Sequence, residues 1–295
     1  MERTKMKITL AKYAGFCFGV KDAMDAAEAL GTDVPHPIHI LGHLIHNKQA
    51  VDRLAKKGIR MVPHEELDTI TKGTVVISAH GVPDDTIAKA RDKGLHVVDT
   101  TCPLVRKVHD ATKKMEKEGY EILIYGDEKH TEVKGIRGNL RKSDVIHNPS
   151  EINVQFGRKK VFMVSQTTQE IEKFRELAEK LKKENPQLKV EDTICVPTKL
   201  RQKNSRELAK IVDVMIVIGG YHSANTRHLA EVCNRYTPTH HIETADRLQR
   251  EWFSGKRHCG VTAGASTPDW IINSVIERLQ NEFGGAMEEL PLQKN

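Results

Sequence analysis

Three cysteines occupy similar positions in the sequence, each between an apolar run and a helical pattern. Residues 99–102 and 192–195 share the string D-T-x-C, and Cys17 follows the strand-like run 7–13 in the same way. The three cysteines recur at intervals of about 90 residues, a common size for a domain. A thiolate at a helix N-terminus is stabilised by the helix dipole and by free backbone N–H groups. The spacing therefore predicts one equivalent thiolate in each of three units.

Three thiolates that meet at one point would form a soft metal site with one coordination position left open. Such a donor set suits an iron–sulfur cluster or zinc, and the open position is available for chemistry. Each cysteine could instead fill the core, because free cysteine is often buried. We prefer that alternative for Cys233, inside a helical pattern, and for Cys259, at the start of a strand. It stays open for the other three, since no C-x-x-C spacing is present.

Polar side chains follow the other apolar runs, at the expected carboxyl ends of strands. They are His46, His80, His130, Thr167, Ser223, Asn225 and Ser266. In parallel sheets these ends share one rim with helix N-termini, where an anion such as a diphosphate binds. Each serine, threonine or asparagine could equally be an ordinary helix N-cap. The anion-site hypothesis depends on the coincidence of many such groups at one rim.

Glu132 is the candidate proton donor because it lies two residues after His130, in a loop that follows the apolar run 121–126. A carboxylate near a thiolate–metal site donates a proton effectively if burial raises its pKa. A solvated glutamate in the first turn of a helix fits the spacing equally well.

The elements that must position these residues alternate regularly. Short β-branched runs predict strands at 75–78, 96–99, 121–126, 161–165, 214–220 and 259–264. Amphipathic patterns predict helices at 103–118, 169–183, 198–212, 223–236 and 268–283. This alternation predicts an α/β fold with mostly parallel sheets. With the cysteine repeat, it predicts three pseudo-equivalent units at 1–101, 102–194 and 195–282, followed by a C-terminal tail at 283–295.

Composition narrows the class of protein. The 295 residues carry 46 Lys and Arg against 40 Asp and Glu, a net charge of +6 that suits an anionic ligand or an acidic protein partner. Mean hydropathy is −0.49, and no apolar run approaches the roughly 18 residues of a membrane span. The first ten residues lack the apolar stretch and cleavage site of a signal peptide. An odd number of cysteines, five, suits metal ligands or free thiols in a reducing cytoplasm.

Two other classes of function compete with a redox enzyme. A basic nucleic-acid-binding protein is disfavoured by an aromatic content of 5%, because single strands bind by stacking on aromatic rings. A zinc hydrolase could use the same three thiolates, and zinc without acid-labile sulfide would identify it.

The motifs around these residues resemble those of the 4-hydroxy-3-methylbut-2-enyl diphosphate reductases, the LytB/IspH family. In chain order they are GFCFGV, SAHGV, DTTCPLVRKVH, HTEVKG, SQTT, DTICVPT, GGYHSANT and TAGASTP. The resemblance covers residues 11–282 and implies a trefoil of three α/β units around a central cavity. It also implies a [4Fe–4S] cluster held by Cys17, Cys102 and Cys195. The family's reaction reductively removes a hydroxyl as water to give isopentenyl and dimethylallyl diphosphate, the last step of the non-mevalonate isoprenoid pathway.

The resemblance also implies roles for individual residues. The diphosphate would be held by His46, His80, His130, Ser223, Ala224, Asn225 and Ser266. Glu132 would deliver the proton, and Thr167 would position both Glu132 and the substrate. The chain has no nicotinamide or flavin fingerprint, so the electrons would come from a ferredoxin or flavodoxin. Such carriers are often acidic, and the positive net charge would favour their encounter.

The chain departs from the family's motifs at four positions. Ala224 stands where a second serine is usual, which removes one hydroxyl donor. In the family's G-H-x-x-H-P-E-V, the first histidine is Asp127 and the proline is Thr131. Phe18 follows the first cysteine, where a small residue is common. These changes affect the expected diphosphate contacts and loop shape, and leave the thiolates and Glu132 in place.

Overall fold

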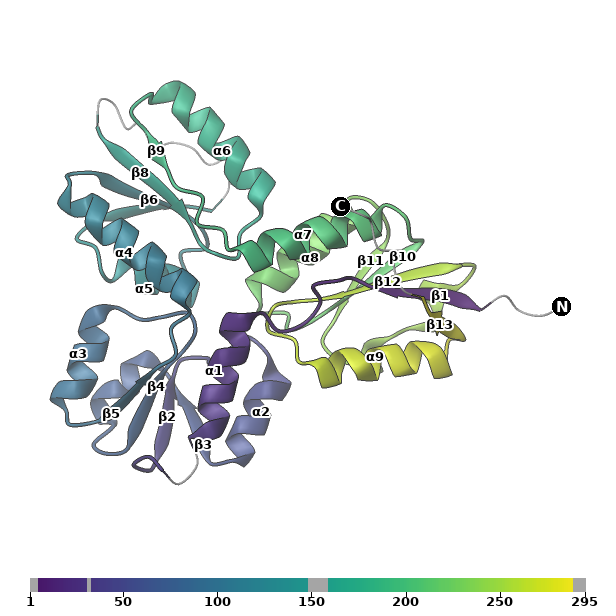
Figure 1. The fold of residues 1–295 in the computed structure, drawn as a ribbon, viewed down its shortest axis with the longest axis horizontal. Coiled ribbons are helices and arrows are strands. Elements are labelled where there is room, and N and C mark those ends of the chain that lie inside the picture. The colour runs from purple at the N-terminus through teal and green to yellow at the C-terminus, as the bar shows by residue number, and fades with distance from the viewer. Residues whose placement is uncertain (1–4, 31–32, 148–158, 289–295) are drawn as a thin grey trace. The chain divides into compact units, whose positions relative to one another are not determined.

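The computed structural model describes residues 5–30, 33–147 and 159–288, in which strands alternate with helices (Figure 1). The strands are β1 (Met6–Leu10), β2 (Ile38–Leu41), β3 (Ile59–Val62), β4 (Thr74–Ile77), β5 (His96–Asp99), β6 (Glu121–Tyr125), β7 (Ser143–Ile146), β8 (Val161–Ser165), β9 (Lys189–Val190), β10 (Val214–Ile218), β11 (Thr239–Ile242), β12 (His258–Ala263) and β13 (Gly285–Met287). The α-helices are α1 (Phe18–Ala29), α2 (Lys48–Lys56), α3 (Asp84–Asp92), α4 (Pro103–Lys117), α5 (Thr131–Arg137), α6 (Ile171–Glu184), α7 (Val196–Ala209), α8 (Ala224–Asn234) and α9 (Asp269–Asn281). Short 3-10 helices are η1 (His64–Thr69), η3 (Ala245–Arg247) and η4 (Arg250–Phe253). The six strands and five helices expected from the sequence are all present, with slightly different ends.

The described strands form three sheets. Their orders are β3-β2-β4-β5, β7-β6-β8-β9 and β11-β10-β12-β1-β13, and all the pairings are parallel. The expected α/β class with mostly parallel sheets is confirmed.

The three sheets are versions of one four-strand pattern. In each, the strand in second place is followed by a glycine whose N–H donates to the last residue of its outer neighbour. These bonds join Gly42 to Val62 (2.7 Å), Gly126 to Ile146 (3.0 Å) and Gly219 to Ile242 (2.9 Å). In the third sheet the fourth place is filled by β1, which comes from the opposite end of the sequence. The repeat is therefore circularly permuted along the chain.

This permutation corrects the expected boundaries. The proposed first unit, 1–101, is divided, because β1 pairs with β12 rather than with β2 to β5. The expected tail, 283–295, contributes β13, which pairs with the other edge of β1. The boundaries predicted at Cys102 and Cys195 fall just after β5 and β9, so they agree with the strand pairing of the first two sheets. A trefoil of three units stays a prediction.

The chain divides into two compact units, each described here by itself. One contains Met1–Cys17, His46–Lys48 and Val196–Asn295, and the other contains Phe18–Ile45 and Gln49–Cys195. The first unit carries the third sheet, and the second unit carries the other two.

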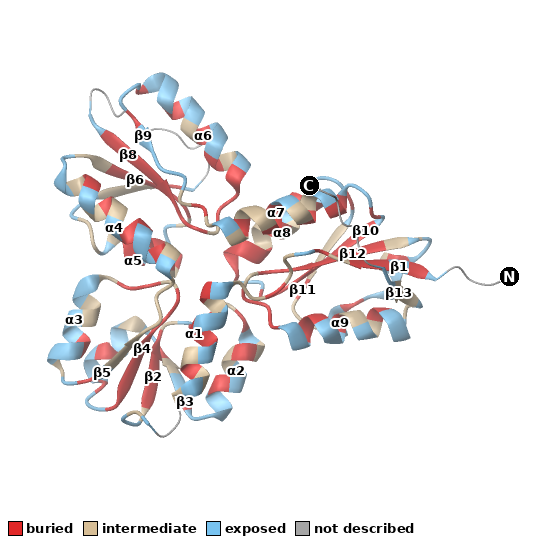
Figure 2. Ribbon diagram, viewed as in Figure 1, coloured by how far each residue is buried: buried red, intermediate tan, exposed pale blue. Residues whose placement is uncertain are grey.

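Helices cover the sheets so closely that the central strands are buried throughout (Figure 2). In β8 all five residues are buried, and Met163 packs with Phe174 and Leu177 of α6. A strand covered on both faces needs apolar residues at every position, which explains the continuous apolar runs in the sequence. The polar residues are left for the ends of the strands. Among the described helices, none has both the length and the apolar composition that crossing a membrane requires.

Candidate functional site

The three predicted cysteines have the same backbone setting. Each directly precedes a helix, α1, α4 or α7. The N–H of each cysteine donates to the carbonyl of the residue two positions past the end of the adjacent strand. These bonds are Cys17 to Ala265 (3.1 Å), Cys102 to Ala79 (3.0 Å) and Cys195 to Thr167 (3.0 Å). The expected repeat of thiols at strand-to-helix joints is confirmed at the level of the backbone.

The other two cysteines differ in environment. Cys233 and Cys259 are fully buried, and desolvation raises the pKa of each thiol to about 12. A metal ligand must be a thiolate, which such burial disfavours. The three cysteines at helix starts are partly exposed. The interpretation of Cys233 and Cys259 as core residues therefore agrees with their burial.

The surroundings of Cys102 fit a metal-binding thiolate. Gly19, in the first turn of α1, lies so close that a Cβ there would be 2.6 Å from the Cys102 Sγ. A side chain at position 19 would collide with the sulfur, so glycine permits this approach. Three partly exposed thiols at helix N-termini form a soft donor set that suits an iron–sulfur cluster or zinc. The sequence reasoning missed Gly19, although its place two residues after Cys17 in GFCFGV was a signal.

Glu132 is buried in the first turn of α5, with 1% of its surface exposed. The Thr167 N–H donates to its Oε1 (2.6 Å), and the Thr167 hydroxyl donates to its Oε2 (2.9 Å). Burial raises the pKa of Glu132 to about 7, although these two bonds oppose the rise. A solvated glutamate is excluded by this environment. The side chain can hold or release a proton near neutral pH.

Two histidines lie together at the start of α5. His130 is the N-cap of α5, and its Nδ1 accepts from the Glu132 N–H at 3.2 Å. This bond assigns the imidazole proton of neutral His130 to Nε2. The His80 ring meets the His130 ring edge-on, with centroids 5.5 Å apart. Burial, and then the nearby His130, lower the pKa of His80 to about 3, so its imidazole is neutral at pH 7.

The remaining diphosphate candidates lie in the other compact unit. Ser223 is the N-cap of α8, and its Oγ accepts from the Thr226 N–H at 3.3 Å. Ala224 and Asn225 follow in the first turn and are buried, and the Asn225 Nδ2 has no hydrogen-bond partner among the described residues. The carbonyl of His46 accepts from the Ser266 hydroxyl at 3.4 Å.

The predicted residues thus fall into two groups, one in each compact unit. Cys102, Cys195, His80, His130, Glu132 and Thr167 form one group, and Cys17, His46, Ser223, Ala224, Asn225 and Ser266 form the other. Within the first group, the structure brings Glu132 to Thr167 and His80 to His130. Within the second, it brings Ser266 to His46.

The departures from the family pattern have structural roles of their own. Asp127 accepts the Lys129 N–H at its Oδ1 (2.9 Å), while its own N–H donates to the Gln166 Oε1 (3.1 Å). It therefore shapes the loop that leads to His130. Thr131 is the first residue of α5, a position that also suits proline. Phe18 begins α1 and is 46% exposed.

The fold and the site together define a class of protein: an α/β protein with three equivalent cysteines and a buried carboxylic acid. The chain belongs to the LytB family, since the family described as LytB protein matches residues 8–280. A relative from Clostridioides difficile (strain 630), named 4-hydroxy-3-methylbut-2-enyl diphosphate reductase, is 45% identical over 94% of this chain and 100% of its own length. A relative of the same name from Aquifex aeolicus (strain VF5) is 42% identical, over 95% of this chain and 98% of its own.

Two solved structures are similar to this chain. One is described as (E)-4-hydroxy-3-methyl-but-2-enyl diphosphate reductase, the terminal enzyme of the non-mevalonate pathway. It is 41% identical, with a TM-score of 0.65 over 93% of this chain and 99% of that one. The other is the E-1-hydroxy-2-methyl-but-2-enyl-4-diphosphate reductase from Plasmodium falciparum. It is 26% identical, with a TM-score of 0.90 over 99% of this chain and 94% of that one.

Proposed function

We propose that this chain is a 4-hydroxy-3-methylbut-2-enyl diphosphate reductase of the non-mevalonate isoprenoid pathway. The reaction breaks the allylic C–O bond and forms a C–H bond. Two electrons and two protons are consumed, and the hydroxyl leaves as water. The products are isopentenyl and dimethylallyl diphosphate. The observation that carries the proposal is the identical backbone setting of three partly exposed cysteines.

The cofactor in this proposal is a [4Fe–4S] cluster held by Cys17, Cys102 and Cys195. When bound, it supplies electrons and a Lewis-acidic iron with a vacant position. The close approach of Gly19 to the Cys102 Sγ supports Cys102 as one of these ligands.

The diphosphate is bound by neutral donors in this proposal. They are the side chains of His46, His80, His130, Ser223, Asn225 and Ser266, with the backbone of Ala224 in place of a second serine hydroxyl. The buried Asn225 Nδ2 supports this role, because a buried donor without a partner is costly unless a ligand satisfies it. The N-terminus of α8 adds its dipole and free N–H groups.

Glu132 holds the proton that is delivered to the substrate. Its raised pKa, about 7, keeps a large fraction of the carboxyl groups protonated at neutral pH. Thr167 fixes the carboxyl group through two hydrogen bonds and so determines where the proton is presented.

The electrons come from a separate protein, a ferredoxin or flavodoxin, in the cytoplasm. The positive net charge of +6 supports encounter with an acidic carrier.

Anaerobic purification followed by metal and sulfide analysis tests the cofactor. We expect about four irons and about four sulfides per chain. Cys102→Ala should lose the cluster, whereas the matched control Cys233→Ala should keep it, because Cys233 is a buried thiol. Reduction of 4-hydroxy-3-methylbut-2-enyl diphosphate by the loaded protein tests the activity. A full cluster in Cys102→Ala would refute the ligand assignment, and zinc without sulfide would favour a hydrolase.

A further inference from the structure

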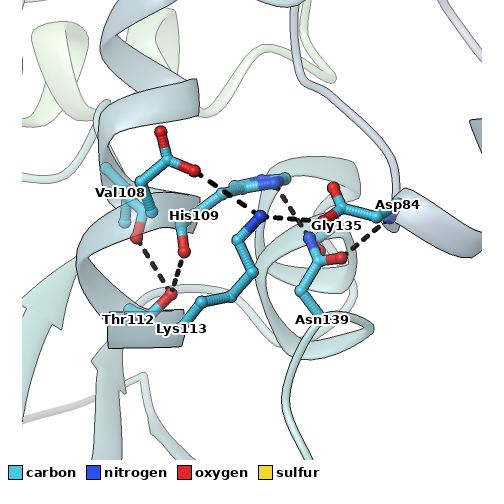
Figure 3. A network of polar contacts seen from close by, with 8 residues as sticks. Asp84, Val108, His109, Thr112, Lys113, Gly135 and Asn139 are labelled. Carbon is cyan, nitrogen blue, oxygen red and sulfur yellow. Dashed lines mark hydrogen bonds and ion pairs between the residues drawn. The ribbon is translucent and has the colours of Figure 1, made fainter. Parts of the chain in front are cut away.

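A group of polar contacts, part-buried to exposed, joins three helices outside the residues assigned above (Figure 3). We call it the Asn139 latch, defined as the His109 side chain on α4, the Asn139 side chain just after α5, and the backbone N–H of Asp84 at the start of α3. All three lie in the same compact unit.

Asn139 uses both ends of its amide group. Its Oδ1 accepts from the Asp84 N–H at 2.7 Å. Its Nδ2 donates to the Gly135 carbonyl at 3.1 Å and contacts the His109 Nδ1 at 3.0 Å. Pro83, the N-cap of α3, makes no side-chain capping bond. Asn139, just after α5, therefore accepts a hydrogen bond from the first N–H group of α3, which the Pro83 side chain cannot do.

His109 is buried, with 5% of its surface exposed. Because Nδ1 faces the Asn139 donor, the neutral ring carries its proton on Nε2. Burial lowers the pKa of His109 to about 4, so the ring remains a neutral acceptor at physiological pH.

Two glycines bring the backbones together around the latch. A Cβ at Gly135 would be 3.2 Å from the Gly81 carbonyl oxygen, and a Cβ at Gly138 would be 2.3 Å from the Pro83 Cγ. The end of α5 therefore lies directly on the loop 78–83. This close packing and the contacts of Asn139 together hold the loop against the end of the helix.

Each element joined by the latch carries a residue of the proposed site. Helix α4 begins after Cys102, seven residues and about two turns before His109. The loop 78–83 carries His80, and the preceding Ala79 accepts the Cys102 N–H. Helix α5 carries Glu132 one turn before Gly135, on the same face.

We infer that the Asn139 latch positions Cys102, His80 and Glu132 relative to one another, so that Asn139 and His109 are positioning residues of the site. The inference rests on the proposed function for the roles of those three residues. Neither Asn139 nor His109 is assigned a contact with substrate.

The test compares variants of the iron-loaded protein that remove single parts of the latch. Asn139→Leu removes the donor and the acceptor while keeping the number and branching of the side-chain heavy atoms. His109→Leu removes the acceptor, whereas His109→Asn places an amide oxygen near the position of Nδ1. Lys113→Met is the matched control, because it removes the ion pairs of Lys113 with the carboxylates of Asp84 (2.8 Å) and Asp110 (3.5 Å) and leaves the Asn139 hydrogen bonds in place.

We expect Asn139→Leu and His109→Leu to lower kcat at least tenfold at unchanged iron content. His109→Asn should return to within threefold of wild type, and Lys113→Met should stay within twofold. Hydrogen exchange at the Cys102 and Glu132 amides should accelerate at least tenfold in the two leucine variants only. If Asn139→Leu fails to fold, the comparison of His109→Leu with His109→Asn tests the inference.

The inference is overturned if His109→Asn is as impaired as His109→Leu, or if the leucine variants keep wild-type kcat and exchange rates. A loss of kcat that equals the unfolded fraction, measured by thermal unfolding, also overturns it. If the wild-type protein does not reduce 4-hydroxy-3-methylbut-2-enyl diphosphate, the proposed function fails instead. The exchange rates at the two amides then still decide whether the latch holds these segments.

Discussion

The starts of helices α5 and α8 occupy equivalent places in two repeats and differ in chemistry. Each helix follows the strand in second place of its sheet and begins after a side-chain cap, His130 in α5 and Ser223 in α8. The second helical residue is buried in both, Glu132 in one and Asn225 in the other. The backbone frame is thus repeated, while the side chain at one position decides between an acid and a neutral donor.

The neighbouring loop accounts for the difference. After β8, Thr167 gives the Glu132 carboxyl group an N–H and a hydroxyl bond. The equivalent residue after β12 is Ala265, which has no polar side chain, and within the described part of the chain the Asn225 Nδ2 has no hydrogen-bond partner. At the start of α5, the buried polar side chain has hydrogen-bond partners within the protein and is suited to hold a proton. At the start of α8, the buried Asn225 amide has a donor available and is suited to bind a ligand.

The largest expected effect comes from Glu132→Gln, which removes the proton donor and keeps a side chain of the same shape. We expect kcat to fall about 10²- to 10⁴-fold, the usual contribution of general acid catalysis, with the cluster and substrate affinity retained. Anaerobic steady-state kinetics and iron analysis measure this. Turnover close to that of wild type would remove Glu132 from the mechanism and end the contrast between the two helix starts.

Asn225→Asp makes α8 resemble α5 and places a carboxylate where a diphosphate is proposed to bind. We expect the Kd for inorganic pyrophosphate, measured by calorimetry, to rise about 10- to 100-fold through like-charge repulsion. Asn234→Asp, at the far end of the same helix, is the charge-matched control and should change the Kd less than twofold. Equal effects of the two substitutions would mean that Asn225 has no specific role in anion binding.

Thr167→Val keeps the N–H bond to Glu132 and removes the hydroxyl bond. The hydroxyl stabilises the carboxylate and lowers the pKa of Glu132, so its loss should raise that pKa above about 7. Protonated Glu132 is the active form, hence activity falls as the pH rises through this pKa. We therefore expect the alkaline limb of the kcat–pH profile to move to higher pH, with an approximately fivefold lower maximum because the carboxyl group is held less firmly. A shift of the limb to lower pH would contradict this account.

Ala224→Ser should have the smallest effect, because it adds one hydroxyl beside a cap that Ser223 already provides. We expect the KM to change less than about threefold, the range of one weak hydrogen bond, at constant kcat. A large fall in KM would show that the hydroxyl missing at Ala224 limits substrate binding and that the backbone of Ala224 does not replace it.

The strands that the sequence analysis did not predict lie mainly at the edges of the sheets. The polar edge strand β11 has the sequence THHI, and β7 has SDVI, so neither shows a continuous apolar run. Edge strands bury less of their surface than central ones, and their composition is constrained less. The membership of β1 in the last sheet was missed for a different reason. Pairing between residues about 250 positions apart leaves no local pattern.

The sequence by itself determined the alternation of the apolar strands with amphipathic helices and the position of each cysteine before a helix, because both follow from local periodicity and helix-start chemistry. Only the tertiary structure decided that Glu132 is buried against Thr167, that Gly19 makes room for the Cys102 sulfur, and that Asn139 caps α3. Each of these contacts joins segments far apart in the chain. Their energies depend on desolvation and close packing, which exist only once the sheets and helices have assembled.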